Sequence, residues 1–141
     1  MTVPNWIIWG ALAVAGLYIL VLLTGSIFIW IRAFHSVADV KFFDIFAMRF
    51  RKTDPSLIVD NLILLKDNEI IDIDLADLEN HHLGGGNVDN VVLAIIHASK
   101  SNLVLDWKAV TAYDFAGRDI FQIVTSAIQS GNLNELEPLL K

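Results

Sequence analysis

The chain has 141 residues, no cysteine and a formal net charge of -6 at neutral pH. The absence of cysteine excludes disulfides, thiolate nucleophiles and thiolate metal sites. The acidic balance argues against nucleic-acid binding, which requires a basic face.

The first predicted element is a transmembrane helix. Residues 6–31 read WIIWGALAVAGLYILVLLTGSIFIWI, 26 residues without one charged side chain. A bilayer core of about 30 Å needs about 20 apolar helical residues, so this run spans it with some tilt. A cleavable signal peptide is disfavoured because Lys and Arg are missing before the run and the run is too long. We assign residues 1–32 to a transmembrane anchor that includes Trp6, Trp9, Trp30 and Arg32.

Small residues gather in this span at Gly10, Ala11, Ala15 and Gly16. Such patches let helix backbones approach each other and indicate self-association. Gly and Ala are also common in transmembrane helices in general, so both interpretations stay open.

Charge is divided unevenly along the chain. Residues 32–52 carry five basic and two acidic side chains, a balance of +3, whereas residues 53–141 carry five basic and fourteen acidic ones, a balance of -9. The positive-inside rule places the basic side of the span in the cytoplasm. We therefore expect a cell-membrane protein with its N-terminus outside and an acidic cytoplasmic domain.

Residues 33–53 form a membrane-proximal segment rich in Phe, Arg and Lys. Aromatic crowding with flanking basic residues is typical of a segment that lies at the membrane interface or dips into it. A second full span is disfavoured because Asp39, Lys41 and Asp44 would have to cross hydrocarbon. Packing of the aromatic side chains on the cytoplasmic domain remains an alternative. The residues expected at the membrane here are Phe42, Phe43, Phe46, Arg49, Arg51 and Lys52.

A mainly α-helical cytoplasmic domain is predicted for residues 54–130. Asp54 and Pro55 start a helix that runs to Lys66. Alternating, β-branched stretches predict short strands at residues 69–73 and 103–105. Residues 131–141 are assigned to a flexible tail. Four further helices are predicted at residues 75–83, 88–100, 107–115 and 120–129, with N-caps at Asp74, Asn87, Asp106 and Asp119, and with glycine ends at Gly84, Gly85, Gly86 and Gly117.

This domain carries an internal similarity. The stretch that starts at Ile71, IDIDLADLENHHLGGGNVDNVVLAI, aligns without a gap on the one that starts at Leu103, LVLDWKAVTAYDFAGRDIFQIVTSA, at an offset of 32 residues. Caps align with caps, and one glycine that ends a helix is kept. A period of this length is typical of stacked supersecondary units. We predict a small stack of two to three repeats of about 32 residues, in which the short strands pair.

Three clusters invite an assignment of chemistry. Residues 84–87 precede a helix and suit an anion, but no Walker lysine and no GxGxxG motif accompany them, so a turn is favoured. His81 and His82, with Glu79 and His97, lack the i, i+4 spacing of a helical zinc site. Asp72, Asp74 and Asp77 lack the EF-hand spacing. We expect no enzyme activity, no metal and no cofactor.

Arg118 is the charged residue singled out in the second turn. Its guanidinium is expected to brace the helix ends beside Asp114 and Asp119, with a lipid phosphate or a neighbouring subunit as the alternative contact. The glycines and caps above, together with Arg118, are assigned to structural turns.

Two stretches also carry a family resemblance. HHLGGGNVDNVV (residues 81–92) and DFAGRD (residues 114–119) resemble the N-terminal region of the bacterial flotillin-like FloA proteins. VADVKFFDIFAMRFRK (residues 37–52) is similar to the membrane-proximal segment of that family. The resemblance covers about residues 37–124, with an apolar anchor in the corresponding place.

The resemblance implies a membrane scaffold that oligomerises in membrane microdomains, or rafts. The family continues into an SPFH domain and a coiled-coil region where this sequence reads QSGNLNELEPLLK to Lys141, so a reduced role as anchor or co-assembling subunit is expected. The expected partners are membrane lipids and other copies of the chain or a flotillin-like protein, with no nucleic acid and no small-molecule substrate. The alternative is a membrane-tethered adaptor whose acidic helical domain recruits a protein partner.

Overall fold

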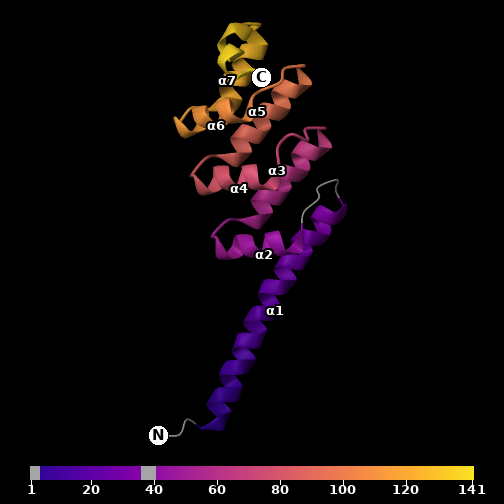
Figure 1. Ribbon diagram of the computed structural model, residues 1–141, viewed down its shortest axis with the longest axis vertical. Coiled ribbons are helices and arrows are strands. Elements are labelled where there is room, and N and C mark those ends of the chain that lie inside the picture. The colour runs from indigo at the N-terminus through magenta and orange to yellow at the C-terminus, as the bar shows by residue number, and fades with distance from the viewer. Residues whose placement is uncertain (1–3, 36–40) are drawn as a thin grey trace.

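The chain is an elongated, mainly helical molecule, with its N-terminal helix and its C-terminal helix at opposite ends of the long axis (Figure 1). The computed structural model describes residues 4–35 and 41–141. Within these residues there are seven α-helices and one 3-10 helix. Their bounds are α1 (Asn5–His35), α2 (Phe42–Phe50), α3 (Pro55–Asp67), α4 (Leu75–Leu83), α5 (Val88–Lys100), α6 (Trp107–Phe115), α7 (Ile120–Ser130) and η1 (Leu133–Leu139).

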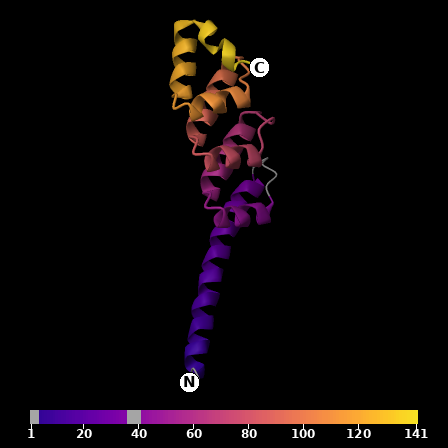
Figure 2. The ribbon, with the colours of Figure 1, turned by 60° about the vertical axis from the view of Figure 1, so that its left-hand side comes forward.

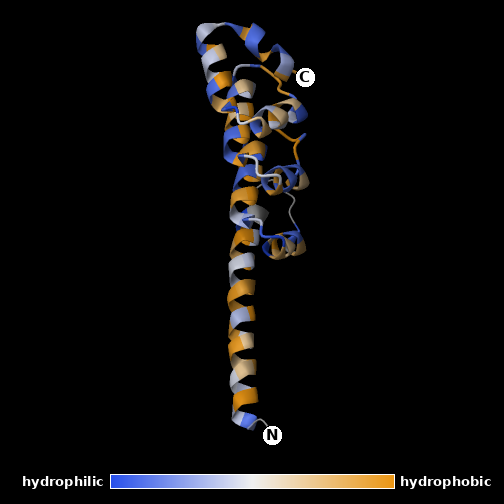
Figure 3. Cartoon of the chain, turned by 90° about the vertical axis from the view of Figure 1, so that its left-hand side faces the viewer, coloured by the Kyte–Doolittle hydropathy of each residue, from blue (hydrophilic) through white to orange (hydrophobic). Residues whose placement is uncertain are grey.

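Short and long helices alternate after α1. The helices α2, α4 and α6 have nine residues each, whereas α3 and α5 have thirteen and α7 has eleven. The long helices form one column in line with α1, and the short helices extend from one side of this column (Figures 1 and 3). The predicted helical class and the N-terminal apolar helix are confirmed.

Helix starts are fixed by local side chains. Asp74 accepts from the backbone N–H of Asp77 at 2.8 Å, and the Asp77 carboxylate accepts from the N–H of Asp74 at 3.2 Å, which completes a capping box. The four other caps, each of which accepts from a backbone N–H in the first turn of its helix, are Asp54, Asn87, Asp106 and Asp119. Such a cap stabilises a helix by about 1 kcal/mol, and it needs only neighbouring residues.

The core lies between the long helices. Its largest fully buried side chains include Ile58 and Leu65 of α3, Val91 of α5 and Ile120 of α7. Polar side chains connect the same helices, because Asn61 donates to Asp89 at 2.6 Å and Asn90 donates to Asp119 at 2.8 Å. Apolar burial supplies the stabilisation, and these amide contacts set how far each helix is shifted along its neighbour.

Helix α1 enters the stack without a break. Among the described residues it is the one helix long and apolar enough to span a membrane. The side chains of residues 5–21 are exposed, whereas Ser26 is buried and Ile29 and Trp30 pack against the core. Arg32 then contacts α3, with one Nη 3.0 Å from Ser56 Oγ and 2.9 Å from Asp60 Oδ1. The end of α1 therefore occupies the first place in the column of long helices.

The two predicted strands are wrong, since neither residues 69–73 nor residues 103–105 form a strand. Glu69 has a φ of +63° and turns the chain, and the N–H of Ile70 then donates back to the carbonyl of Leu65 at 3.0 Å. The Nζ of Lys66 donates to the carbonyls of Ile71 and Ile73, where a neighbouring strand would have to donate. Of the two alternating isoleucines, Ile73 is buried in the core, whereas Ile71 is 73% exposed.

The predicted flexible tail is also a misassignment. Residues 133–139 form η1, which lies beside α7 (Figure 2), and Leu136 and Leu139 are fully buried. The Leu139 carbonyl accepts from the N–H of Asp106 at 2.7 Å, and an isolated antiparallel bridge joins Leu105 to Leu140. Two leucines three residues apart cover the open end of the core, a pattern too short to stand out in the sequence.

Candidate functional site

The turn between α4 and α5 contains three glycines, and each position favours glycine for a different physical reason. A Cβ on Gly84 would lie 2.8 Å from Cζ of Phe115, and a Cβ on Gly86 would overlap the imidazole ring of His81. Gly85 has a φ of +85°, a conformation that favours glycine. The turn is therefore built for close contact with side chains of α4 and α6.

His81 is the centre of this contact. Its side chain is 2% exposed, and Nε2 lies 2.9 Å from Oδ2 of Asp114, although the angle is poor for a hydrogen bond. The ring centroid is 4.7 Å from that of Phe115 and 5.8 Å from that of Trp107. The Nδ1 atom has no hydrogen-bond partner among the described residues. His81 thus belongs to α4 but is enclosed by α6.

Asp114 connects three elements. Its Oδ2 also accepts from the backbone N–H of Asn87, the N-cap of α5, at 2.7 Å. In the neighbouring contact between α5 and α7, the Asn90 Oδ1 accepts from the N–H of Phe121 at 3.1 Å. Hydrogen bonds from Asn90 and from the N–H of Gln122 lower the pKa of Asp119. We call the set His81, Gly84, Gly86, Asn87, Asp114 and Phe115 the motif junction.

Arg118 lines the same small pocket as Asp114 and Asp119, but its guanidinium stacks on an aromatic ring. Its guanidinium carbon is 5.1 Å from the centroid of the Tyr113 ring, a cation–π contact. Among the ion pairs of the described residues none joins Arg118 to Asp114 or Asp119. Gly117, just before it, has a φ of +76°. The structure therefore gives Arg118 a stacking contact in place of the expected bracing.

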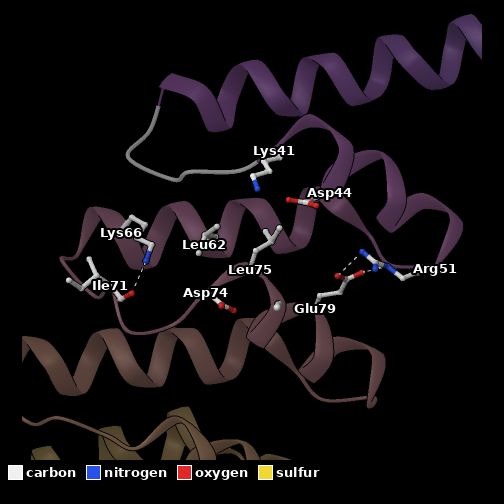
Figure 4. A pocket seen from close by; sticks show the side chains of 10 residues that line it. Lys41, Asp44, Arg51, Leu62, Lys66, Ile71, Asp74, Leu75 and Glu79 are labelled. Carbon is white, nitrogen blue, oxygen red and sulfur yellow. Dashed lines mark hydrogen bonds and ion pairs between the residues drawn. The ribbon is translucent and has the colours of Figure 1, made fainter.

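A cavity of about 680 Å³ lies between α2 and α4, above α3 (Figure 4). Arg51 Nε is 2.9 Å from Glu79 Oε1 at one end, and Lys66 is bound to loop carbonyls at the other. Its charged lining consists of three cations and three carboxylates, namely Lys41, Arg51, Lys66, Asp44, Asp74 and Glu79. Arg51, which was expected at the membrane, therefore joins the end of α2 to α4.

The remaining expected membrane residues lie on α1, on α2 and in the turn after α2. Trp6 and Trp9 are exposed, and so are Phe43 and Phe50 at 79% and 72%. Phe46 is half-buried, with its ring 5.2 Å from that of Phe50. Ile45 and Met48 point into the core. Residues 36–40 of the predicted interfacial segment and the side chain of Phe42 lie outside the described residues, and Lys52 is exposed with a φ of +60°.

The titratable groups of the junction are placed for packing. In the described ranges no group of three or more His, Cys, Asp or Glu side chains is placed to hold a metal ion. His97 packs on Phe121, with ring centroids 5.9 Å apart, away from His81. Trp107, Asp114 and Phe115 were not predicted as partners of His81. The available signal was that the glycine-containing motifs at residues 81–87 and 114–119 lie at the ends of α4 and α6.

Acidification is expected to destabilise the fold through His81. Burial lowers the pKa of His81 below its usual value of 6.5, against the opposing effect of the Asp114 carboxylate. The unfolded chain therefore binds the proton more readily, so stability is complete above pH 6.5 and falls as the pH drops below it. Thermal unfolding of the full chain in detergent between pH 7.5 and 5 measures this. His81→Gln should flatten the profile and His97→Gln should not; equal profiles for both variants would contradict the assignment.

Comparison with known proteins places these features in a family. The family model described as "Flotillin-like protein FloA" matches residues 7–134. The FloA of Protochlamydia amoebophila is 43% identical over 117 residues, which cover 83% of this chain and 34% of the relative. The FloA of Desulfosudis oleivorans is 39% identical over 125 residues, which cover 89% of this chain and 38% of the relative. The chain thus spans little more than a third of the length of these relatives, and no solved structure matches it.

Proposed function

Because the chain belongs to the flotillin-like FloA family, we propose that it is a structural protein of membrane microdomains, which stands on the bilayer and assembles laterally. The partners we propose are membrane lipids and other copies of the chain or a flotillin-like protein. The excess of basic residues after α1 supports an N-terminus outside and a stack in the cytoplasm.

The observation that carries this proposal is the continuity of α1. A tethered adaptor needs a mobile linker between anchor and domain, so that the domain is free to search for its partner. Here Ser26 and Trp30 of the anchor pack into the stack, and Arg32 is paired with Asp60 of α3. This arrangement connects the membrane helix rigidly to the stack, and it favours the structural role over the adaptor.

We also infer that the hairpins α2–α3, α4–α5 and α6–α7 are repeats of one unit. In each of them a nine-residue helix is followed by a turn and a longer helix with an Asp or Asn cap. The residue with positive φ in each turn, Lys52, Gly85 or Gly117, lies two residues before that cap. On this inference α2 to α7 form one stack of three units, which the end of α1 joins through its contacts with α2 and α3.

Lateral assembly is tested through the exposed small-residue face of α1. Ala11 and Ala15 line a shallow apolar groove between Trp6 and Tyr18, whereas Ala13 lies outside it. The full chain in mild detergent should sediment as an oligomer. Ala11→Leu should weaken association roughly ten-fold by keeping backbones apart, and the matched control Ala13→Leu should leave it unchanged.

Mass photometry of the three proteins at equal detergent concentration measures the oligomer fraction. A monomeric wild-type chain that leaves the distribution of membrane domains unchanged would overturn the structural role and favour the adaptor.

A further inference from the structure

We propose that Arg49, seated against Gly25 of α1, binds the phosphate of a membrane phospholipid at the cytoplasmic edge of the hydrocarbon core. This inference rests on the proposed function in one respect, namely that α1 spans the bilayer. It adds a ligand class, a residue that recognises the ligand, and the depth at which the protein sits.

The first step is the contact between Arg49 and Gly25. A Cβ built on Gly25 would lie 2.6 Å from Nη2, 3.5 Å from Cζ and 3.8 Å from Nη1 of Arg49. The guanidinium therefore lies on bare helix backbone, in a seat that any larger residue at position 25 would fill. The ion pairs of the described residues join Arg32 to Asp60, Arg51 to Glu79, His81 to Asp114 and Lys141 to Asp72, and Arg49 is in none of them.

The second step is the depth of this guanidinium. Residues 5–24 are twenty helical residues, about 30 Å long, and they match the hydrocarbon core of a bilayer. The whole apolar run 6–31 is about 39 Å long and exceeds that core by about 9 Å. Helix α2 packs against the far end of α1, and α2 carries Asp44 and Arg49, which are costly to place in hydrocarbon. The hydrocarbon therefore ends near Gly25, at the height of Arg49.

The third step is the chemistry found at that height. Lipid phosphates form a layer at the edge of the hydrocarbon, and the planar guanidinium fork binds a phosphate through two parallel hydrogen bonds. Phe28 of α1 and Phe50 of α2 are 75% and 72% exposed, and interfacial aromatics suit the same layer. A single seated guanidinium favours an anionic phospholipid over a zwitterionic one, whose ammonium group competes for the phosphate.

The absence of cysteine permits a direct test with a single label. A bimane fluorophore on Val21→Cys, an exposed position of α1, lies one helical turn below Gly25, at the level of the acyl chains. The full chain is reconstituted in phosphatidylcholine vesicles that contain doxyl-labelled phosphatidylglycerol or doxyl-labelled phosphatidylcholine. Quenching should show about a five-fold preference for phosphatidylglycerol, the order expected for one cation at an anionic surface.

The variants separate a seated guanidinium from general surface charge. Arg49→Gln should abolish the preference, and Gly25→Ala should remove most of it without a change in charge, because the new methyl group displaces the flexible end of Arg49. Two matched controls should keep it: Lys52→Gln removes the same charge nearby, and Gly16→Ala adds a methyl group where nothing lies within 4 Å.

An equal loss in Arg49→Gln and Lys52→Gln, or equal quenching by both lipids in the wild-type chain, would overturn the site and leave the proposed function standing. Absence of quenching by either lipid would mean that α1 is not in the bilayer, and the proposed function would fail with it.

Discussion

Gly86→Ala is expected to lower the free energy of unfolding by about 2–3 kcal/mol, because the added methyl group overlaps the buried ring of His81. The His81 ring is itself buried, and Trp107 packs against it from the side of α6. Denaturant unfolding of the full chain in detergent, followed by circular dichroism, measures the loss.

A graded series supports the interpretation. Gly84→Ala should cost less, about 1 kcal/mol, because its Cβ would meet the Phe115 ring, which is half exposed and free to shift. Gly16→Ala has nothing within 4 Å and should not destabilise. If all three variants unfold at the same denaturant concentration, the motif junction does not support the stack.

Asp114→Ala is expected to cost about 2–4 kcal/mol. The change leaves the N–H of Asn87 without its acceptor and the imidazole of His81 without its polar neighbour, both at a site where Asp114 itself is 7% exposed. Thermal and denaturant unfolding of the full chain measure this cost.

Two controls accompany this variant. Asp72→Ala removes an exposed carboxylate paired with Lys141 at 2.9 Å and should leave the midpoint unchanged, because such surface pairs contribute little. In a double-mutant cycle with His81→Gln, the two losses should add up to more than the double variant shows. Strict additivity would mean that the two side chains act independently.

The sequence predicts the helices well because their ends are decided locally. Asp74 and Asn87 cap helices through hydrogen bonds to residues three positions away, so both partners lie within one short stretch of sequence. The strand prediction was wrong because it rested on a local pattern alone, whereas the loop is fixed by a contact with Lys66 of α3. Ile71 and Ile73 alternate with polar residues as in a strand, but Lys66 donates to the loop carbonyls, and this replacement of a neighbouring strand depends on side-chain geometry.

The motif junction was beyond the reach of local reasoning. His81 and Asp114 are far apart in sequence, and periodicity says nothing about which short helix will cover a buried imidazole. Gly84 and Gly86 were the sequence signal for this contact, because the turn itself requires glycine only at position 85, where φ is positive. Their purpose follows only when Phe115 is placed beside them.

The unbroken passage of α1 into the column has a mechanical consequence. Transmembrane helices are tilted by roughly 20° on average, and an apolar stretch longer than the bilayer is thick is accommodated by tilting. Since α1 has no hinge between its exposed part and the turns that pack on α3, the stack must lean with it, degree for degree. The C-terminal end, at η1, lies farthest from the N-terminal part of α1 (Figure 1), so a change of tilt displaces it parallel to the membrane surface. The thickness of the bilayer therefore sets the lateral position of η1 relative to the anchor.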